Sequence, residues 1–394
     1  MLGVELFVGL VAIASAAALV TSRLSMPYSV ALILAGLVVG AVIPPEALEV
    51  TPDLILAVLV PGLVFEAAFK LNVAELRKTS GLVAILAVPG VLITAAVVAV
   101  VAWIATGLNL ALGFLLGAMV SATDPVAVIE LFKRLSAPGR LATVVDAEAL
   151  FNDGTGVVLF AIAVVAVSQP VGIAEGAMEF ASVVLVSVIL GVLAGAAAIR
   201  LMSLTDDRLI QVAISVVAAY GTYLVAVRVG QSGIVATVSA GIVVGWAGQG
   251  GRLPQRTMAA LDGVWGFAAF MITALTFLLI GRVIGPELVV RAVPLIVAGY
   301  LAITIARALV VYVLIGGTER ALPGPSLLPV SHLHVMFWAG LRGAIAIALA
   351  LALPENLPQR DLLTGAVYGI VLVTILFQGT TAGWVIRRAG ALND

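Results

Sequence analysis

The sequence predicts an all-α membrane protein with about thirteen transmembrane helices. Of its 394 residues, 62% are hydrophobic and only 10% are charged, and the mean hydropathy is +1.23. Soluble domains carry about 25% charged residues. The 20 Lys and Arg and the 21 Asp and Glu are too few to cover a soluble body of 40.2 kDa, so most of the surface must face lipid.

Apolar runs of about 20 residues, the length that crosses a bilayer, follow one another along the whole chain. We expect thirteen of them, at 4–20, 27–43, 53–69, 81–104, 110–132, 143–167, 178–200, 209–227, 232–247, 262–281, 292–315, 333–353 and 362–386. The longest break between them, 316–332, is too short for a further domain. Residues 1–394 are therefore expected to form a single membrane domain.

The cations are distributed unevenly between the breaks, and Lys and Arg stay on the cytoplasmic side of a membrane. Fourteen fall in odd-numbered breaks or after the last run: Arg23, Lys70, Arg77, Lys78, Lys133, Arg134, Arg140, Arg200, Arg208, Arg252, Arg256, Arg320, Arg387 and Arg388. Four fall in even-numbered breaks: Arg228, Arg282, Arg291 and Arg360. This asymmetry predicts an odd number of crossings, with the N-terminus outside and the C-terminus in the cytoplasm.

Charge and side-chain chemistry exclude several classes of partner. A net charge of -1 gives no basic surface for nucleic acid. The absence of Cys excludes disulfides, thiolate zinc sites and iron–sulfur clusters, and two His are too few for a metal site without carboxylates. We expect no cofactor.

An odd number of crossings permits two six-helix units, runs 1–6 and 8–13, with opposite orientations in the membrane. Transporters built from inverted repeats place their ion site at interrupted helices near the bilayer midplane. The fifth run is interrupted at Ser121–Pro125, and its counterpart, the twelfth, at Gly340–Gly343. Pro125 lacks a backbone donor and displaces the carbonyl of Ser121, which leaves a free acceptor within the membrane. The sequence therefore predicts two crossed, broken helices.

Ionisable residues inside membrane helices cost several kcal/mol and mark functional sites. They gather in four runs: Glu66 in the third, Asp124 in the fifth, Asp146, Glu148 and Asp153 in the sixth, and Arg342 in the twelfth. We expect Asp153 and Asp124 to face each other across the broken segment, with Thr123 and Asn152 adding neutral oxygens. An all-oxygen set of this kind suits a hard cation.

Two facing carboxylates in a low-dielectric site repel each other unless a cation or a proton neutralises them. If they can face either side only when neutralised, alternating access exchanges the cation for protons. Arg342 needs an anionic partner at such depth, and Glu148 is the expected one, as a structural pair beside the site. Arg307 is expected to contact backbone carbonyls or a neighbouring acid.

Three segments, Gly117–Val128, Glu148–Gly154 and Gly340–Ala344, closely resemble motifs of the cation/proton antiporter family, in its NhaP-like sodium/proton exchanger branch. The resemblance covers essentially the whole chain. It implies a homodimer in the plasma membrane, with a mobile core at about 81–167 and 292–388 and a dimerisation part at about 1–69 and 178–281. It also implies an elevator-like movement of the core.

The resemblance assigns roles to individual positions around Asp153. The ion-carrying aspartate of the family falls on Asp153, and the pair in its unwound helix falls on Thr123 and Asp124. Asn152, preceding Asp153, matches the branch that exchanges one cation for one proton without net charge. The resemblance therefore implies electroneutral exchange of Na+ or Li+ for H+, with Asp153 and Asp124 as the residues that hold the transported metal ion.

Further positions match the surroundings of the family's site. The buried ion pair maps onto Glu148 and Arg342, and the acid of the third helix onto Glu66. Glu66 and Ser121 are candidate outer ligands. The family often has Ser at the position of Ala149, so one hydroxyl ligand is absent here.

Three alternatives remain open at this point. Exchange of K+ for H+ would use the same residues. A cation channel could also be lined by broken helices and acids. An intramembrane protease is suggested only by Gly230–Gly233, and neither His lies where a catalytic base is needed. We expect a transporter rather than an enzyme.

Overall fold

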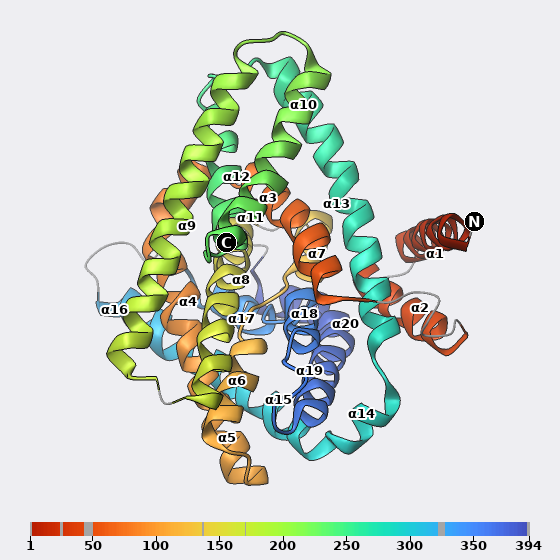
Figure 1. Cartoon of the computed structure of the whole chain (residues 1–394), viewed down its shortest axis with the longest axis vertical. Helices are drawn as coiled ribbons and strands as arrows, with labels where there is room; N and C mark the ends of the chain where they lie inside the picture. The colour runs from red at the N-terminus through yellow and green to blue at the C-terminus, as the bar shows by residue number, and fades with distance from the viewer. Residues whose placement is uncertain are drawn as a thin grey trace.

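The computed structural model describes residues 2–23, 27–42, 50–135, 138–169, 171–321 and 328–391. Figure 1 shows a helical body, and the described residues contain no β-strand. The first half of the chain forms α1 (Leu2–Arg23), α2 (Tyr28–Val42), the π-helix η2 (Leu54–Leu59), α3 (Val60–Lys70), α4 (Val73–Ala87), α5 (Pro89–Thr106), α6 (Leu110–Met119), α7 (Val126–Leu135), α8 (Gly139–Ser168) and α9 (Ile173–Met202).

The second half continues with α10 (Arg208–Val216), η3 (Val217–Gly221), α11 (Thr222–Arg228), α12 (Gly233–Gln249), α13 (Gln255–Val283), α14 (Pro286–Arg291), α15 (Val293–Ala308), η4 (Leu309–Ile315), α16 (Gly316–Ala321), α17 (Val330–Trp338), α18 (Ala344–Leu351), α19 (Arg360–Val373), η5 (Thr374–Gly379) and α20 (Thr380–Ala389). Each apolar run expected from the sequence coincides with one of these helices or with consecutive ones. The short helices α14 and α16 were not expected.

Several of these helices are long and apolar enough to cross a membrane. Seven such helical stretches lie within the described residues: Val73–Thr106, Gly139–Ser168, Ile173–Met202, Arg208–Arg228, Gln255–Val283, Val293–Thr318 and Arg360–Ala389. Four shorter apolar helices accompany them: Val8–Thr21, Tyr28–Val42, Leu110–Met119 and Gly233–Gln249. The protein is an all-helical, multi-pass membrane protein, as the composition predicts.

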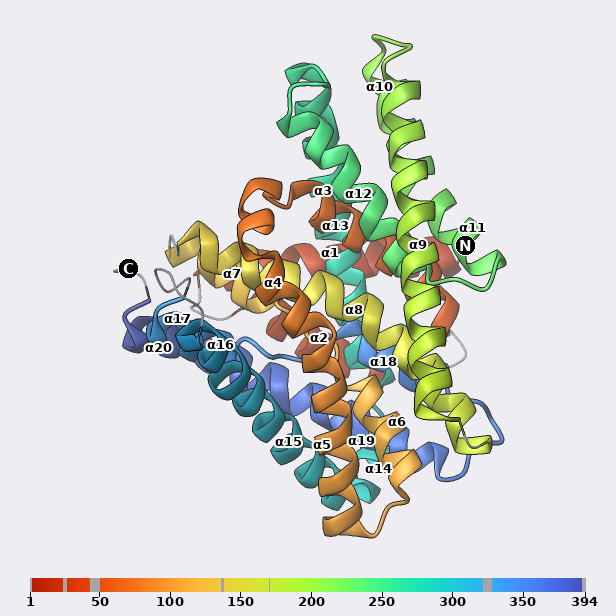
Figure 2. The ribbon, with the colours of Figure 1, turned by 90° about the vertical axis from the view of Figure 1, so that its left-hand side faces the viewer.

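The helices pack mainly in two groups. In one group, α13 packs on α2 and α12 packs on both α3 and α9. In the other, α5 packs on α6 and α15, α8 on α4 and α6, and α19 on α15. Figure 2 shows α9, α10, α12 and α13 rising away from the group that contains α5, α15 and α19.

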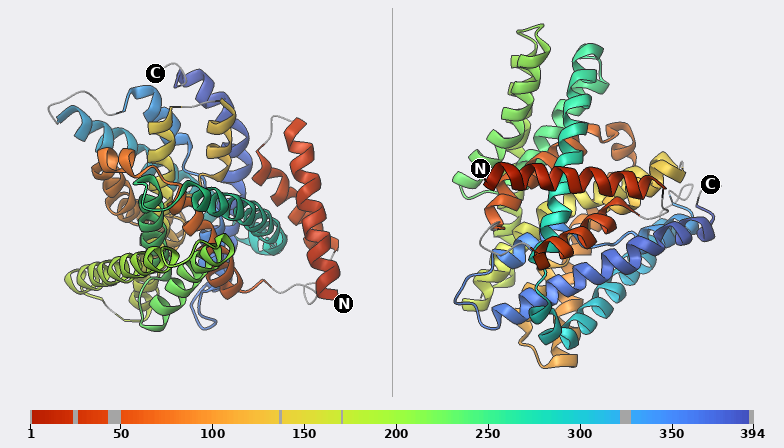
Figure 3. Two further views of the ribbon diagram at one scale, coloured as in Figure 1. Left: turned by 90° about the horizontal axis from the view of Figure 1, so that it is seen from above. Right: turned by 90° about the vertical axis from the view of Figure 1, so that its right-hand side faces the viewer.

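Small residues bring helices of the first group close together. Figure 3 shows α1 and α2 lying across α13, and α2 contacts α13 through Gly36 and Gly281. A Cβ atom built on Gly281 would stand only 2.9 Å from the Cα of Gly36, so the two backbones can meet only because both residues are glycine.

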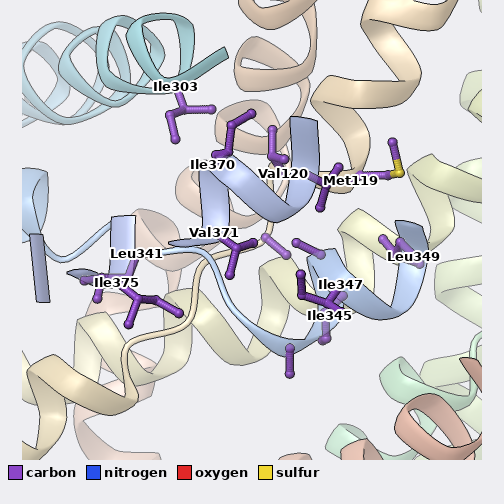
Figure 4. Close-up of a cluster of buried hydrophobic side chains, with 14 of the residues drawn as sticks. Met119, Val120, Ile303, Leu341, Ile345, Ile347, Leu349, Ile370, Val371 and Ile375 are labelled. Atoms are coloured by element: carbon purple, nitrogen blue, oxygen red, sulfur yellow. The ribbon is translucent and has the colours of Figure 1, made fainter. Parts of the chain in front are cut away.

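Two helices of the second group are interrupted where the sequence predicts. After α6, residues 120–125 are not helical until α7 begins behind Pro125, and residues 339–343 separate α17 from α18. Figure 4 shows Val120 and Leu341, one from each interruption, in one apolar cluster with Ile345, Ile370 and Val371. This packing holds the two interruptions side by side.

Candidate cation-binding site

The two interruptions are joined directly through their backbones. The N–H of Asp124 donates a hydrogen bond to the carbonyl oxygen of Leu341, with a donor–acceptor distance of 2.8 Å. Backbone groups that leave a helix inside a membrane must find other partners. Each interruption supplies a partner to the other, so the two segments cross at Asp124.

The carboxylate of Asp124 lies at the first turns of two helices. Its Oδ1 accepts a hydrogen bond from the N–H of Val126 at 3.1 Å, and the N–H of Ala344 also donates to the carboxylate. The positive ends of α7 and α18 therefore both face this side chain. Gly343 leaves the necessary space, because a Cβ atom there would overlap Oδ2 of Asp124.

Thr123 is held against α8 by Asn152. Asn152 accepts a hydrogen bond from the backbone N–H of Thr123 through Oδ1 at 3.1 Å, and its Nδ2 donates to Oγ1 of Thr123 at 2.8 Å. Both residues are buried. This pair fixes the broken segment beside Asp153, the next residue of α8.

Arg342 is only 2% exposed and contacts backbone oxygens rather than an acid. Its Nη1 donates to the carbonyl of Ser121 at 2.7 Å and to that of Ala122 at 3.1 Å. The carbonyl of Ser121 is the acceptor that Pro125 was expected to free. The guanidinium of one interruption thus satisfies the orphan carbonyls of the other.

Glu148 is paired with Arg307 of α15, so the predicted pair of Glu148 with Arg342 is wrong. Nη1 of Arg307 contacts Oε1 of Glu148, and Nη2 lies 2.9 Å from Oε2. Arg307 also donates to the carbonyl of Met336 from Nε at 3.0 Å and from Nη2 at 2.7 Å. The planar guanidinium group of Arg307 matches the geometry of the Glu148 carboxylate, whereas the guanidinium group of Arg342 donates to backbone carbonyls. Both alternatives expected for Arg307, backbone and acid, occur together.

A large cavity of about 720 Å³ opens beside the crossing. The polar and charged residues that line it are Thr21, Tyr28, Glu66, Lys70, Thr123, Asp124, Glu130, Asp146, Asp153, Thr273 and Thr276. Its walls come from both helix groups: α1, α2, α3 and α13 on one side, and the 122–130 segment, α8 and α18 on the other.

Asp153 is half-buried, and within the described residues it differs from Glu148 and Arg342 in having no hydrogen-bond or ion-pair partner. In the described part of the chain, no group donates a hydrogen bond to its carboxylate or forms an ion pair with it. Asp124 lies close enough to act on it electrostatically. The structure therefore brings both aspartates into the lining of one cavity, and Ala149 also lines that cavity.

A small cavity of about 10 Å³, enough for roughly one water molecule, lies on the other side of the broken segment. Its polar lining consists of Thr94, Ser121, Thr123, Glu148, Asn152, Arg307 and Arg342. Ser121, a candidate outer ligand, is on this side, and its Oγ donates to the carbonyl of Ala118 at 2.8 Å. Glu66, the other candidate, lines the large cavity.

Two basic partners of the acids were not predicted from the sequence. Lys70 lies 2.7 Å from Glu66, measured from Nζ to Oε1, and Arg307 is the partner of Glu148. The first could have been found, since an acid and a lysine four residues apart meet on a helix surface. The second had no local signal, because 159 residues separate Glu148 from Arg307.

Residues 10–388 match the model of a protein family described as "Sodium/hydrogen exchanger, transmembrane". The antiporter ApNhaP of Aphanothece halophytica is 33% identical over 94% of this chain and 71% of its own length. The low-affinity antiporter NhaS1 of Synechocystis is 32% identical with the same coverage. The NhaP antiporter of Pseudomonas aeruginosa is 31% identical over 83% of this chain and 79% of its own length.

The fold also matches a solved structure. The sodium proton antiporter MjNhaP1 of Methanocaldococcus jannaschii, at pH 8, superposes with a TM-score of 0.82 over 99% of both chains, at 17% identity. That similarity concerns the fold. The family model spans nearly the whole chain, including both interruptions and the large cavity between the helix groups. The chain therefore belongs to the sodium/hydrogen exchanger family.

Proposed function

We propose that this protein exchanges one Na+ for one H+ across the plasma membrane without net charge movement, and that Asp153 and Asp124 hold the transported ions in turn. Li+ is proposed as a second substrate. The observation that carries the proposal is the pair of aspartates in one cavity, one of which has no partner among the residues that the structure describes. The family relationship and the relatives named as Na+/H+ antiporters support the choice of Na+.

Coupling follows from electrostatics. Two bare carboxylates in a low-dielectric cavity repel each other and carry a large desolvation cost, so an unloaded site cannot readily pass through the membrane interior. A bound cation or a bound proton removes that cost. Because both occupy the same oxygens, the site crosses with one or the other, and exchange results.

Thr123, Asp124 and Asp153 present oxygens to the cavity, and Asn152 positions Thr123. The Asn152 amide carries no charge, so the position before Asp153 adds no second carboxylate. This supports an electroneutral exchange.

The proposed membrane arrangement has thirteen crossings, with inverted six-helix repeats that place the α6–α7 and α17–α18 interruptions in equivalent positions. The N-terminus is proposed to lie outside and the C-terminus in the cytoplasm. Two observations support an odd number of crossings. The cations are concentrated in alternate breaks, and α1 begins on the opposite side of the molecule from the end of α20 (right-hand view of Figure 3).

We further propose that residues of about 81–167 and 292–388 form a mobile core and that about 1–69 and 178–281 form the dimerisation part of a homodimer. The two helix groups described above support this division. The large cavity lies between them. An elevator-like movement of one group along the other would carry Asp124 and Asp153 from one side of the membrane to the other.

The test is ion-driven proton flux in proteoliposomes with an imposed pH gradient. Na+, Li+ or K+ is added in turn, with the membrane potential clamped at zero and then at either sign. We expect Na+ and Li+ to alkalinise an acidic lumen at rates that do not depend on the potential. Proton flux driven only by K+ would identify K+ as the substrate in place of Na+. Cation flux that follows the membrane potential without coupling to protons would indicate a channel.

Asn152→Asp provides a matched variant for the stoichiometry. It adds one ionisable carboxylate beside Asp153 while keeping the size of the side chain. We expect exchange by this variant to respond to the membrane potential, since a second proton can then be carried per cation. Potential-independent exchange in both proteins would show that Asn152 does not set the charge balance.

A further inference from the structure

A lysine lies among the acids at the edge of the large cavity. Lys70, the last residue of α3, lines this cavity together with Glu66, Asp124 and Asp153. Its Nζ is 2.7 Å from Oε1 of Glu66 and 3.3 Å from Oδ1 of Asp262 on α13. The ammonium group therefore holds a place next to a cavity-lining carboxylate that an entering cation would also seek.

The two partners of Lys70 differ in their surroundings. The side chain of Glu66 is 18% exposed and lines the cavity, whereas that of Asp262 is 63% exposed and is not part of the lining. Lys70 itself is 39% exposed, so the cavity reaches solvent at this point. The long, flexible side chain of Lys70 can shift between the inner acid and the outer acid with little movement.

We propose that Lys70 is a tethered competitor for the transported cation, a residue that sets the apparent affinity for Na+ at the mouth of the cavity. Its ammonium occupies Glu66 when no cation is entering and moves to Asp262 when a cation takes Glu66. This inference rests on the proposed function, since it concerns the entry of the exchanged ion.

The physical basis is competition at a partly buried carboxylate. A Na+ ion near Glu66 is repelled by the ammonium group 2.7 Å away from that carboxylate. Binding therefore requires the ion pair of Lys70 with Glu66 to open. Asp262 lowers the cost of opening, because it keeps a charged partner for the displaced ammonium. Removing Lys70 and removing Asp262 should thus shift the Na+ affinity in opposite directions.

The experiment measures the apparent KM for Na+ of purified protein in proteoliposomes, at one pH, for four proteins: the unsubstituted protein, Lys70→Gln, Asp262→Asn and the double variant. We expect Lys70→Gln to lower the KM roughly fivefold, within the range of partly exposed ion pairs, and Asp262→Asn to raise it about twofold. In the double variant, we expect Asp262→Asn to have no further effect on the KM, because the ammonium group of Lys70 that Asp262 would receive is absent.

Lys78→Gln is the matched control. Lys78 also lies 2.7 Å from an acid, Oε1 of Glu75, but neither residue lines the large cavity. The control should leave the KM for Na+ unchanged, so an equal fall in both lysine variants would reduce the effect to general surface charge and overturn the inference.

The remaining outcomes separate the mechanisms. An unchanged KM in Lys70→Gln would overturn the inference while exchange by the unsubstituted protein still supported the proposed function. If Asp262→Asn raised the KM for Na+ twofold even in the absence of Lys70, the charge of Asp262 would be acting on the cation directly. That result would contradict the tethered competitor. Asp262 is exposed, so its variant tests the inference even if Lys70→Gln folds poorly.

Discussion

The two faces of the broken segment between α6 and α7 treat charge in opposite ways. On the small-cavity face, Glu148 is paired with Arg307, and Arg342 is bound by two carbonyls. On the large-cavity face, the carboxylate of Asp153 has no such partner within the described residues, and it shares the lining of the large cavity with Asp124. The same segment thus separates compensated charges from an uncompensated one.

We propose that this difference separates charges with a structural role from charges that hold the transported ions. A buried charge left without a partner is costly, and the fold keeps it only where something else supplies the counter-charge. Arg307 links α15 to α8 through Glu148, and Arg342 links the two interruptions through the carbonyls of residues 121 and 122. Within the described residues, the cavity beside Asp153 has far more room for a cation than the small cavity on the other face.

The largest expected effect comes from Asp153→Asn. The substitution removes the uncompensated carboxylate but keeps its volume, so we expect Na+-driven proton flux to fall by at least about a hundredfold. The thermal melting temperature in detergent should stay equal or rise, because no ion pair is lost. Retained flux in this variant would remove Asp153 from the carrier role.

A large loss of stability is expected on the other face, from Arg307→Met. It leaves Glu148 charged and unpaired in the interior, which costs about 3–5 kcal/mol. The melting temperature of the purified protein should fall markedly. Adding Glu148→Gln in the same protein should recover part of the loss, and a melting temperature unaffected by Arg307→Met would contradict a structural role for the pair.

A smaller effect is expected from Gly343→Ala at the crossing. The added methyl group would overlap Oδ2 of Asp124 and force the carboxylate away from the N–H of Ala344. We expect a cost of about 1–3 kcal/mol in stability together with weakened Na+-dependent flux. Gly317→Ala is a suitable control because nothing lies within 4 Å of a Cβ atom at that position.

The smallest effect is expected from Ala149→Ser. Ala149 lines the large cavity, one turn before Asp153 on α8. A hydroxyl at this position would add one neutral oxygen ligand, and we expect the apparent KM for Na+ to fall by about threefold, the worth of one ordinary hydrogen bond. An unchanged KM for both Na+ and Li+ would place the ion away from this turn.

Local sequence signals predict the interruptions and the gathering of acids well. Pro125 and the glycines around Arg342 mark backbone that cannot continue as helix, and charged residues in apolar runs stand out individually. The partner of each charge was harder to predict. Arg342 and Arg307 are both buried arginines, so the sequence does not say which of them pairs with Glu148. The structure shows that Arg342 binds the carbonyls of Ser121 and Ala122, whereas Arg307 pairs with Glu148.

The cavity mouth shows the same limit. The spacing of Glu66 and Lys70 on one helix face is visible in the sequence, whereas Asp262 lies almost two hundred residues away, on α13. The packing of α3 directly against α13, which brings Asp262 to Lys70, depends on helix contacts that no local pattern encodes.

In the proposed exchange, Na+ and H+ compete for the same carboxylates, and calorimetric titration of the purified protein with Na+ measures this competition. Repeating the titration in two buffers with different ionisation enthalpies reports the number of protons released per bound cation. We predict that Na+ binding near neutral pH releases protons, about one per site at most, and that Asp153→Asn abolishes both binding and release. Na+ binding without proton release, or with equal affinity in Asp153→Asn, would show that the two ions do not compete for Asp153.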